Sequence, residues 1–113
     1  MILTNIEQVP GKRIVRHLGL VNGNTVRAKH VGRAKHVGRD IMAGLKNLIG
    51  GELTGYTELL TESRDLATQR MVSEAEAMGA NAVLNVRFST STISQGAAEL
   101  MAYGTAVVIE DDL

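Results

Sequence analysis

The chain has 113 residues, with 12 Lys and Arg against 12 Asp and Glu, and it contains no Cys. This length predicts a single domain that spans residues 1–113. The balanced charge argues against nucleic acid and anionic membranes as partners, because no net field attracts either of them. The lack of Cys excludes disulfides, thiolate nucleophiles and cysteine–zinc sites.

No stretch approaches the length of about 18 apolar residues that a membrane-spanning helix needs. The first ten residues include Glu7 and lack a continuous apolar stretch, so they do not resemble a signal peptide, and we expect a cytoplasmic protein. Aromatic residues make up only 3% of the chain, and there are 12 Gly. Because large rings contribute the most burial per residue, this composition favours additional apolar contact from a partner subunit.

The first quarter of the chain is rich in strand-forming residues. Ile2–Thr4 predicts a short first strand, and Val9–Gly11 predicts a turn with Pro and Gly at its two central positions. Arg13–Val21 predicts a longer strand. Asn22-Gly23 is the strongest hairpin signal in the chain, so we expect a reversal there and a short returning strand over Thr25–Ala28.

A tandem duplication occupies residues 27–38. The sequence Arg-Ala-Lys-His-Val-Gly at 27–32 is repeated without change at 33–38. Two copies of six residues are too few and too short for a solenoid, which makes this a local duplication. Because the entropy of loop closure grows only logarithmically with length, we expect one copy to be dispensable for the fold.

Two helices are expected in the middle of the chain. Apolar residues recur at helical spacing over Asp40–Ile49, which predicts a short helix that ends at Gly50-Gly51. A longer helix is predicted over Thr57–Met78, with Gly79 as its C-terminal cap. The expected apolar stripe of the longer helix consists of Tyr56, Leu60, Ser63, Ala67, Met71, Ala75 and Met78.

The last third of the chain predicts two strands. Apolar and polar residues alternate over Ala82–Ser89, and Ser89–Gly96 is polar and turn-like. Leu100–Ile109 is apolar on both faces, and strands of this kind are usually covered on both sides. One helix covers one face, so a second subunit is expected on the other. The predicted fold class is α+β, a small antiparallel sheet packed on one long helix with a shorter helix beside it.

Few residues are candidates for chemistry. His30 and His36 are copies of one position, and a spacing of six does not let one chain place both on a single metal ion, on a helix or on a strand. We expect them to be solvated, and we expect His17 to lie at the surface or half buried. Glu58 and Glu62 share a helix face, where exposure to solvent is expected rather than acid–base work. The sequence therefore favours a protein that is not an enzyme.

Five short motifs resemble those of the YbjQ-like family. They follow the family's order and spacing, once one copy of the duplication is set aside, and they span nearly the whole chain. The motifs are Gly38–Ile41, Gly50–Glu52, Tyr56–Glu58, Gly79–Val83 and Gly104–Val107. The resemblance implies an α+β, dodecin-like subunit whose partner is itself, in a ring-shaped homopentamer with sheets that extend between neighbours.

Members of that family carry the label "putative heavy-metal-binding", and the resemblance supplies no catalytic residue. Soft heavy metals prefer thiolates, so a divalent metal bound here would need His and carboxylate ligands, gathered from several subunits. Our first hypothesis is a ring that binds a metal ion or small ligand at subunit interfaces, and the alternative is a structural assembly module without catalytic activity. The candidate ligand-binding residues are Arg39, Asp40, Glu52 and Tyr56.

Overall fold

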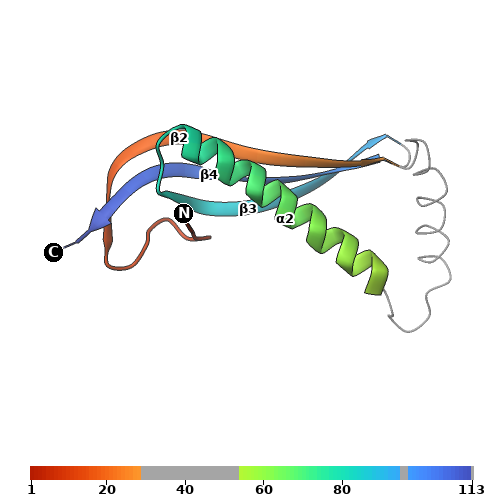
Figure 1. Cartoon of the computed structure of the whole chain (residues 1–113), viewed down its shortest axis with the longest axis horizontal. Helices are drawn as coiled ribbons and strands as arrows, with labels where there is room; N and C mark the ends of the chain where they lie inside the picture. The colour runs from red at the N-terminus through yellow and green to blue at the C-terminus, as the bar shows by residue number, and fades with distance from the viewer. Residues whose placement is uncertain (29–53, 95–96, 113) are drawn as a thin grey trace.

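The computed structural model describes residues 1–28, 54–94 and 97–112, and these form four strands and one helix (Figure 1). The elements are β1 (Ile2–Leu3), β2 (Lys12–Ala28), α2 (Thr54–Ala77), β3 (Ala82–Ser94) and β4 (Ala97–Asp111). Most of the duplication, the predicted short helix and Gly50-Gly51 fall on residues 29–53, outside the described residues. The sequence-based expectations for that segment stay predictions.

The described strands form one sheet in the order β1-β3-β4-β2. β4 pairs antiparallel with both β2 and β3, whereas β1 pairs parallel with β3 over two residues, so the sheet is mixed rather than wholly antiparallel. Figure 1 shows α2 lying across one face of this sheet. The predicted α+β class is confirmed. Within the described ranges, no helix is both long enough and apolar enough to cross a bilayer.

The predicted first strand and the turn that follows it are both confirmed. β1 covers Ile2–Leu3. At the turn, the Lys12 N–H donates to the Val9 carbonyl at 3.0 Å, and Gly11 has a φ of 78°. Pro10 and Gly11 therefore fill the positions that favour Pro and require Gly in a type II turn.

β2 runs without a break through Asn22-Gly23, so the predicted hairpin and the separate strand over Thr25–Ala28 are both wrong. In the ladder with β4, Asn22 lies opposite Tyr103 and Gly23 lies opposite Ala102. A two-residue hairpin of this type needs positive φ at both central residues, and neither Asn22 nor Gly23 has it.

The reason for a glycine at position 23 is the close approach of α2. A Cβ atom built on Gly23 would lie 2.0 Å from the Ala67 carbonyl oxygen and 2.4 Å from the Met71 nitrogen. No side chain fits between the strand and the helix backbone at this point. The sequence signal that predicted a turn thus marks the place where the helix backbone packs directly on β2.

The long helix is confirmed, and it begins earlier than predicted, at Thr54. Its buried stripe comprises Ser63, Ala67, Met71 and Ala75, all at most 3% exposed. The helix ends in a Schellman cap at Gly79, which has a φ of 88°. The Gly79 N–H donates to the Glu76 carbonyl and the Ala80 N–H to the Ala75 carbonyl, each at 3.0 Å.

β3 continues to Ser94, so the predicted turn over residues 89–96 is wrong for the described residues of that stretch. The expected strict alternation from Ala82 is also interrupted. A bulge between Leu84 and Arg87, with Asn85 at a φ of 53°, shifts the register against β4. Val83 and Phe88 therefore lie on the same face of the sheet.

The core consists mainly of side chains between the sheet and α2. The buried residues of this cluster are Val21, Ala67, Met71, Ala75, Val83, Leu100, Ala102 and Ala106. A second, smaller cluster joins Ala82, Leu84, Val107 and Ile109, with Val9 and Ile14 packed against it. Most of these side chains are small, so the helix and sheet pack closely and bury little area per residue.

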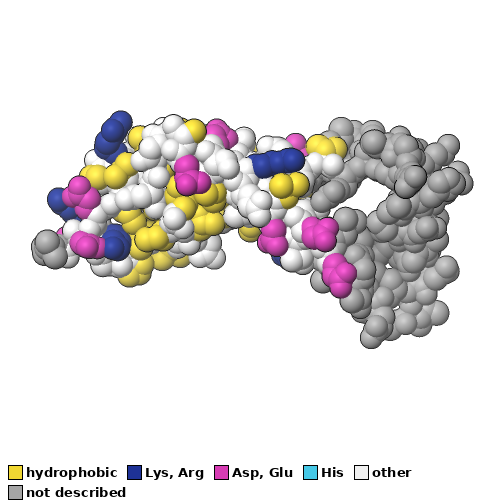
Figure 2. All heavy atoms as spheres, viewed as in Figure 1, with side chains coloured by type: hydrophobic (Ala, Val, Ile, Leu, Met, Phe, Trp, Pro, Cys, Tyr) yellow, Lys and Arg dark blue, Asp and Glu magenta, His cyan; other side chains and the backbone are white. Residues whose placement is uncertain are grey.

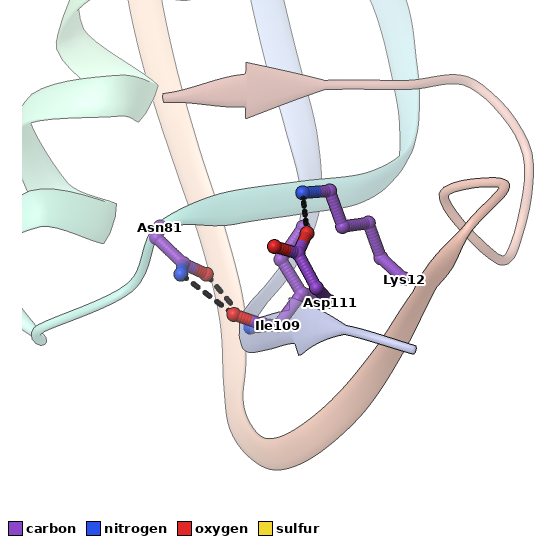
Figure 3. A network of polar contacts seen from close by, with 4 residues as sticks. All are labelled: Lys12, Asn81, Ile109 and Asp111. Atoms are coloured by element: carbon purple, nitrogen blue, oxygen red, sulfur yellow. Dashed lines mark hydrogen bonds and ion pairs between the residues drawn. The ribbon is translucent and has the colours of Figure 1, made fainter. Parts of the chain in front are cut away.

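One end of the sheet is closed by polar contacts (Figure 3). The Asn81 Nδ2 donates to the Ile109 carbonyl at 2.9 Å, and the Ile109 N–H donates to the Asn81 Oδ1 at 2.8 Å. This side-chain amide continues the ladder between β3 and β4 beyond its last backbone pair. Nearby, the Lys12 ammonium binds the Asp111 carboxylate across β2 and β4, which holds the pKa of Asp111 below its ordinary value of 3.8, first through the hydrogen bond and then through charge.

Gly23→Ala should destabilise the subunit strongly, because the added methyl group overlaps the backbone of α2 rather than a flexible side chain. We expect a loss of at least about 1–3 kcal/mol, the usual cost of overpacking. Urea unfolding at a fixed protein concentration measures it. The control, Asn22→Ala, alters a neighbouring exposed side chain on the same strand. Equal stability of the two variants would contradict the proposed packing.

Lys12→Met should raise the pKa of Asp111 towards 3.8, measured by NMR titration of its carboxyl group. A lowered pKa contributes stability that is present above the unfolded value and is lost as the pH falls through the folded value. The unmodified protein should therefore lose this contribution below pH 3.8, and the variant should not. Arg13→Met, which removes the adjacent exposed pair with Glu110, is the control and should leave the pKa of Asp111 unchanged.

Candidate functional site

The four candidate ligand-binding residues are only partly within the described structure. Arg39, Asp40 and Glu52 lie outside the described residues. Tyr56 lies in the first turn of α2, and its side chain is not among those described. A site that combines these four residues stays a prediction.

The other titratable candidates lie where the sequence analysis expected them, as far as they are described. His17 is exposed on β2, and Glu58 and Glu62 are exposed on α2. His30 and His36 fall outside the described residues. None of the three described side chains is placed in a buried environment of the kind that prepares a group for catalysis.

A heavy-metal site does not fit the described part of one chain. Across residues 1–28, 54–94 and 97–112, no group of three or more His, Asp or Glu side chains lies close enough to hold a metal ion. The whole chain also lacks Cys, which supplies the thiolate that soft metals prefer. The described residues of a single subunit thus provide no metal centre.

The main feature left without a partner is one face of the sheet, which we call the open face. It lies opposite α2, and its side chains alternate with those that pack under the helix. From the register of the ladders, the open face carries Leu20, Asn22, Asn24 and Val26 from β2, Glu99, Met101, Tyr103 and Thr105 from β4, and Arg87, Ser89 and Ser91 from β3.

Apolar side chains on the open face are exposed to solvent. Leu20 is 80% exposed, Val26 is 55% exposed and Tyr103 is 37% exposed. Among the described residues, Val9 of the N-terminal segment covers the end of this face near Val107. Exposed apolar side chains on one sheet face are a feature of interaction sites.

Three polar or charged side chains of the open face are engaged within the chain. The Asn24 Nδ2 donates to the Glu99 Oε2 at 2.8 Å, which links β2 to β4. The Arg87 guanidinium donates to the carbonyls of Asn5 at 2.7 Å and Val86 at 3.1 Å, which holds the N-terminal segment against β3. These three side chains therefore support the sheet, whereas Asn22, Ser89 and Ser91 are exposed polar side chains of the same face.

Figure 2 shows hydrophobic side chains at the surface around the N-terminal segment and the strand ends. The exposed ones there include Ile2, Leu3, Ile6 and Val15.

The sequence analysis found one strand of the open face and missed the other. It identified Leu100–Ile109 as apolar on both faces and expected a cover for each. It missed the β2 contribution because the hairpin prediction separated Leu20 from Val26. The signal that could have found it is the even spacing of these two apolar residues along one extended strand.

Sequence comparison gives consistent matches along nearly the whole chain. A model of the family described as "Putative heavy-metal-binding" matches residues 1–110. A UPF0145 protein from Hahella chejuensis is 66% identical over 110 residues, which are 97% of this chain and 100% of that protein. A UPF0145 protein from Clostridioides difficile is 58% identical, with 99% of this chain and 95% of that protein aligned. Another from Thermotoga maritima is 56% identical, with 97% of this chain and 98% of that protein aligned.

Among solved structures, the fold is similar to a DUF74-family protein of unknown function from Pediococcus pentosaceus. The TM-score is 0.59 at 14% sequence identity, over 97% of this chain and 98% of that one. At this identity the likeness concerns the fold alone. From the family match and the close relatives together, the chain belongs to the YbjQ-like family, whose relatives are named UPF0145 proteins.

Proposed function

We propose that the chain is the subunit of a homo-oligomeric ring and works as an assembly module, with the open face covered by neighbouring copies. The observation that carries this proposal is the uncovered sheet face, on which Leu20 is 80% exposed. Burying apolar surface is the main favourable term in association. We place the assembly in the cytoplasm, and a pentamer is the size that the family resemblance implies.

Binding of a metal ion or small ligand would belong to the interfaces rather than to a single subunit. We propose that the ligands come from several copies, because the described residues of one chain hold no group of three or more His, Asp or Glu side chains close enough to bind a metal ion. The donors available in the sequence are imidazole and carboxylate groups, which suit zinc, nickel or copper rather than mercury or cadmium. We propose that the module has no catalytic activity of its own.

Leu20→Lys should reduce the size of the assembly without unfolding the subunit, because the charge is placed on a side chain that α2 does not cover. Light scattering gives the particle mass, and circular dichroism checks the fold. The matched control is Leu60→Lys, which changes an exposed leucine of α2 in the same way. A Leu20→Lys protein that keeps the full mass, or an unmodified protein that is a monomer, would refute the proposal.

A charge at Val107 of β4 would not test the assembly in the same way. Val107 is fully buried within the subunit itself, so a substitution there would disturb the fold of the subunit.

Cadmium should bind weakly, because the chain offers no thiolate. Calorimetry of the untagged, metal-free protein with cadmium chloride is expected to give no stoichiometric binding in the submicromolar range. Zinc chloride in the same buffer is the comparison, since imidazole and carboxylate ligands suit it better. Tight stoichiometric cadmium binding would show that the ligand set differs from the one proposed.

A further inference from the structure

β1 forms one edge of the described sheet and carries exposed apolar side chains. Ile2 is 41% exposed and Leu3 is 39% exposed. The strand is nevertheless held firmly, because the Ile2 N–H donates to the Asn81 carbonyl and the Thr4 N–H donates to the Val83 carbonyl, each at 3.1 Å. A surface that is fixed before binding loses less conformational entropy on association than a loose tail does.

β2 forms the opposite edge, since the strand order is β1-β3-β4-β2. Leu20 of β2 is 80% exposed on the face opposite α2. His17 is also exposed, and it lies on the same face because it pairs with Val107, which is buried on that side. Leu18 between them packs towards the helix. This part of β2 thus presents His17 and Leu20 to a partner at the edge of the sheet.

The outer edge of β2 is engaged only beyond Leu20, as far as the described residues show. The Asn22 N–H donates to the Glu74 Oε2 at 3.2 Å. The Arg70 Nη1 donates to the Asn24 carbonyl. Among the described residues, no side chain makes such a bond to the backbone of residues 17–20. A neighbouring copy therefore finds β2 accessible at Leu20 and before it.

One rung of the sheet joins the two accessible stretches. Ile2 pairs with Ala82. Ala82 pairs with Val107, which pairs with His17. The two ends of this rung are therefore at the same level along the strands, and they lie on the face where Ala82 and Val107 are buried. β1 and β2 also run in the same direction, since β1 is parallel to β3 and β4 is antiparallel to both β2 and β3. Rotation about an axis along the strands keeps the level, so it brings Ile2 of one copy to His17 of the next.

We propose that the subunits meet head to tail, with Ile2 and Leu3 of one copy lying against His17 and Leu20 of the next. The inference rests on the proposed ring and deepens it, because it names the two surfaces that meet. The contact joins two different surfaces, so each copy offers one surface to each of its two neighbours, as a closed ring requires. It also covers the Leu20 end of the open face with apolar side chains.

Because the chain has no Cys, introduced thiols test the contact directly. I2C/H17C places one thiol on each of the two surfaces. Within one chain these positions are three strand spacings apart, about 14 Å, whereas a disulfide needs Cα atoms within about 7 Å. A disulfide can therefore form only between copies. I2C/V26C is the matched control, since Val26 lies on the same strand and face but about 26 Å along the strand from His17.

Mild oxidation of I2C/H17C should give a ladder of covalent oligomers on a non-reducing gel, up to the size of the native assembly, and a reductant should remove it. I2C/V26C should stay largely monomeric on the same gel. A ladder that stops at the dimer would show a contact between two identical surfaces and would overturn the proposal. An I2C/V26C ladder as strong as that of I2C/H17C would also overturn it, because the contact would then lie at another level of the strand.

Failure of this contact and failure of the proposed function give different results. An unmodified protein that is a monomer by light scattering refutes the ring, and the contact with it. An unmodified oligomer whose I2C/H17C variant forms no covalent ladder refutes the contact alone. If I2C/H17C is unfolded by circular dichroism, Ile2→Lys is measured in its place by light scattering. It should lower the mass of the assembly, whereas Leu60→Lys on α2 should not, and an unchanged mass for Ile2→Lys would overturn the contact.

Discussion

The subunit depends on one close contact, the packing of the α2 backbone on β2 at Gly23. This contact fixes which face of the sheet is covered, and therefore which face is left open. It also requires small residues on the buried stripe of the helix, where Ala67 and Ala75 lie. With so little area buried per residue, the fold gains from any further burial that a neighbouring copy supplies.

The same contact positions the helix over the edge strand, which explains why Arg70 and Glu74 meet the backbone of β2. Within the described residues, one face of the sheet carries exposed apolar side chains opposite α2, while these two side chains bind backbone groups at the outer edge of β2.

Much of the fold could be predicted from local patterns. The Pro10-Gly11 turn, the long helix and its cap at Gly79 follow from short-range chemistry, and the structure confirms them. The path of β2 could not be predicted, because the sequence Asn22-Gly23 fits two structures equally well. One is a hairpin turn, in which glycine adopts a positive φ, and the other is a continuous strand, in which glycine allows a helix to pack closely. The bulge at Asn85 also depends on partner strands. The candidate ligand residues lie mainly outside the described ranges, whereas the two-sided apolar strand did indicate the open face.

The position of Asn22-Gly23 inside a strand has a chemical consequence. Asn-Gly is the pair most prone to deamidation in flexible peptides, since the glycine nitrogen attacks the asparagine side chain and forms a succinimide ring. That attack requires the peptide to bend and the Gly23 amide to be free. Here the chain is extended, and the Gly23 amide is on the side of the strand that pairs with β4. The pairing of β2 with β4 therefore protects this peptide from slow covalent ageing, and the protection ends when the two strands separate.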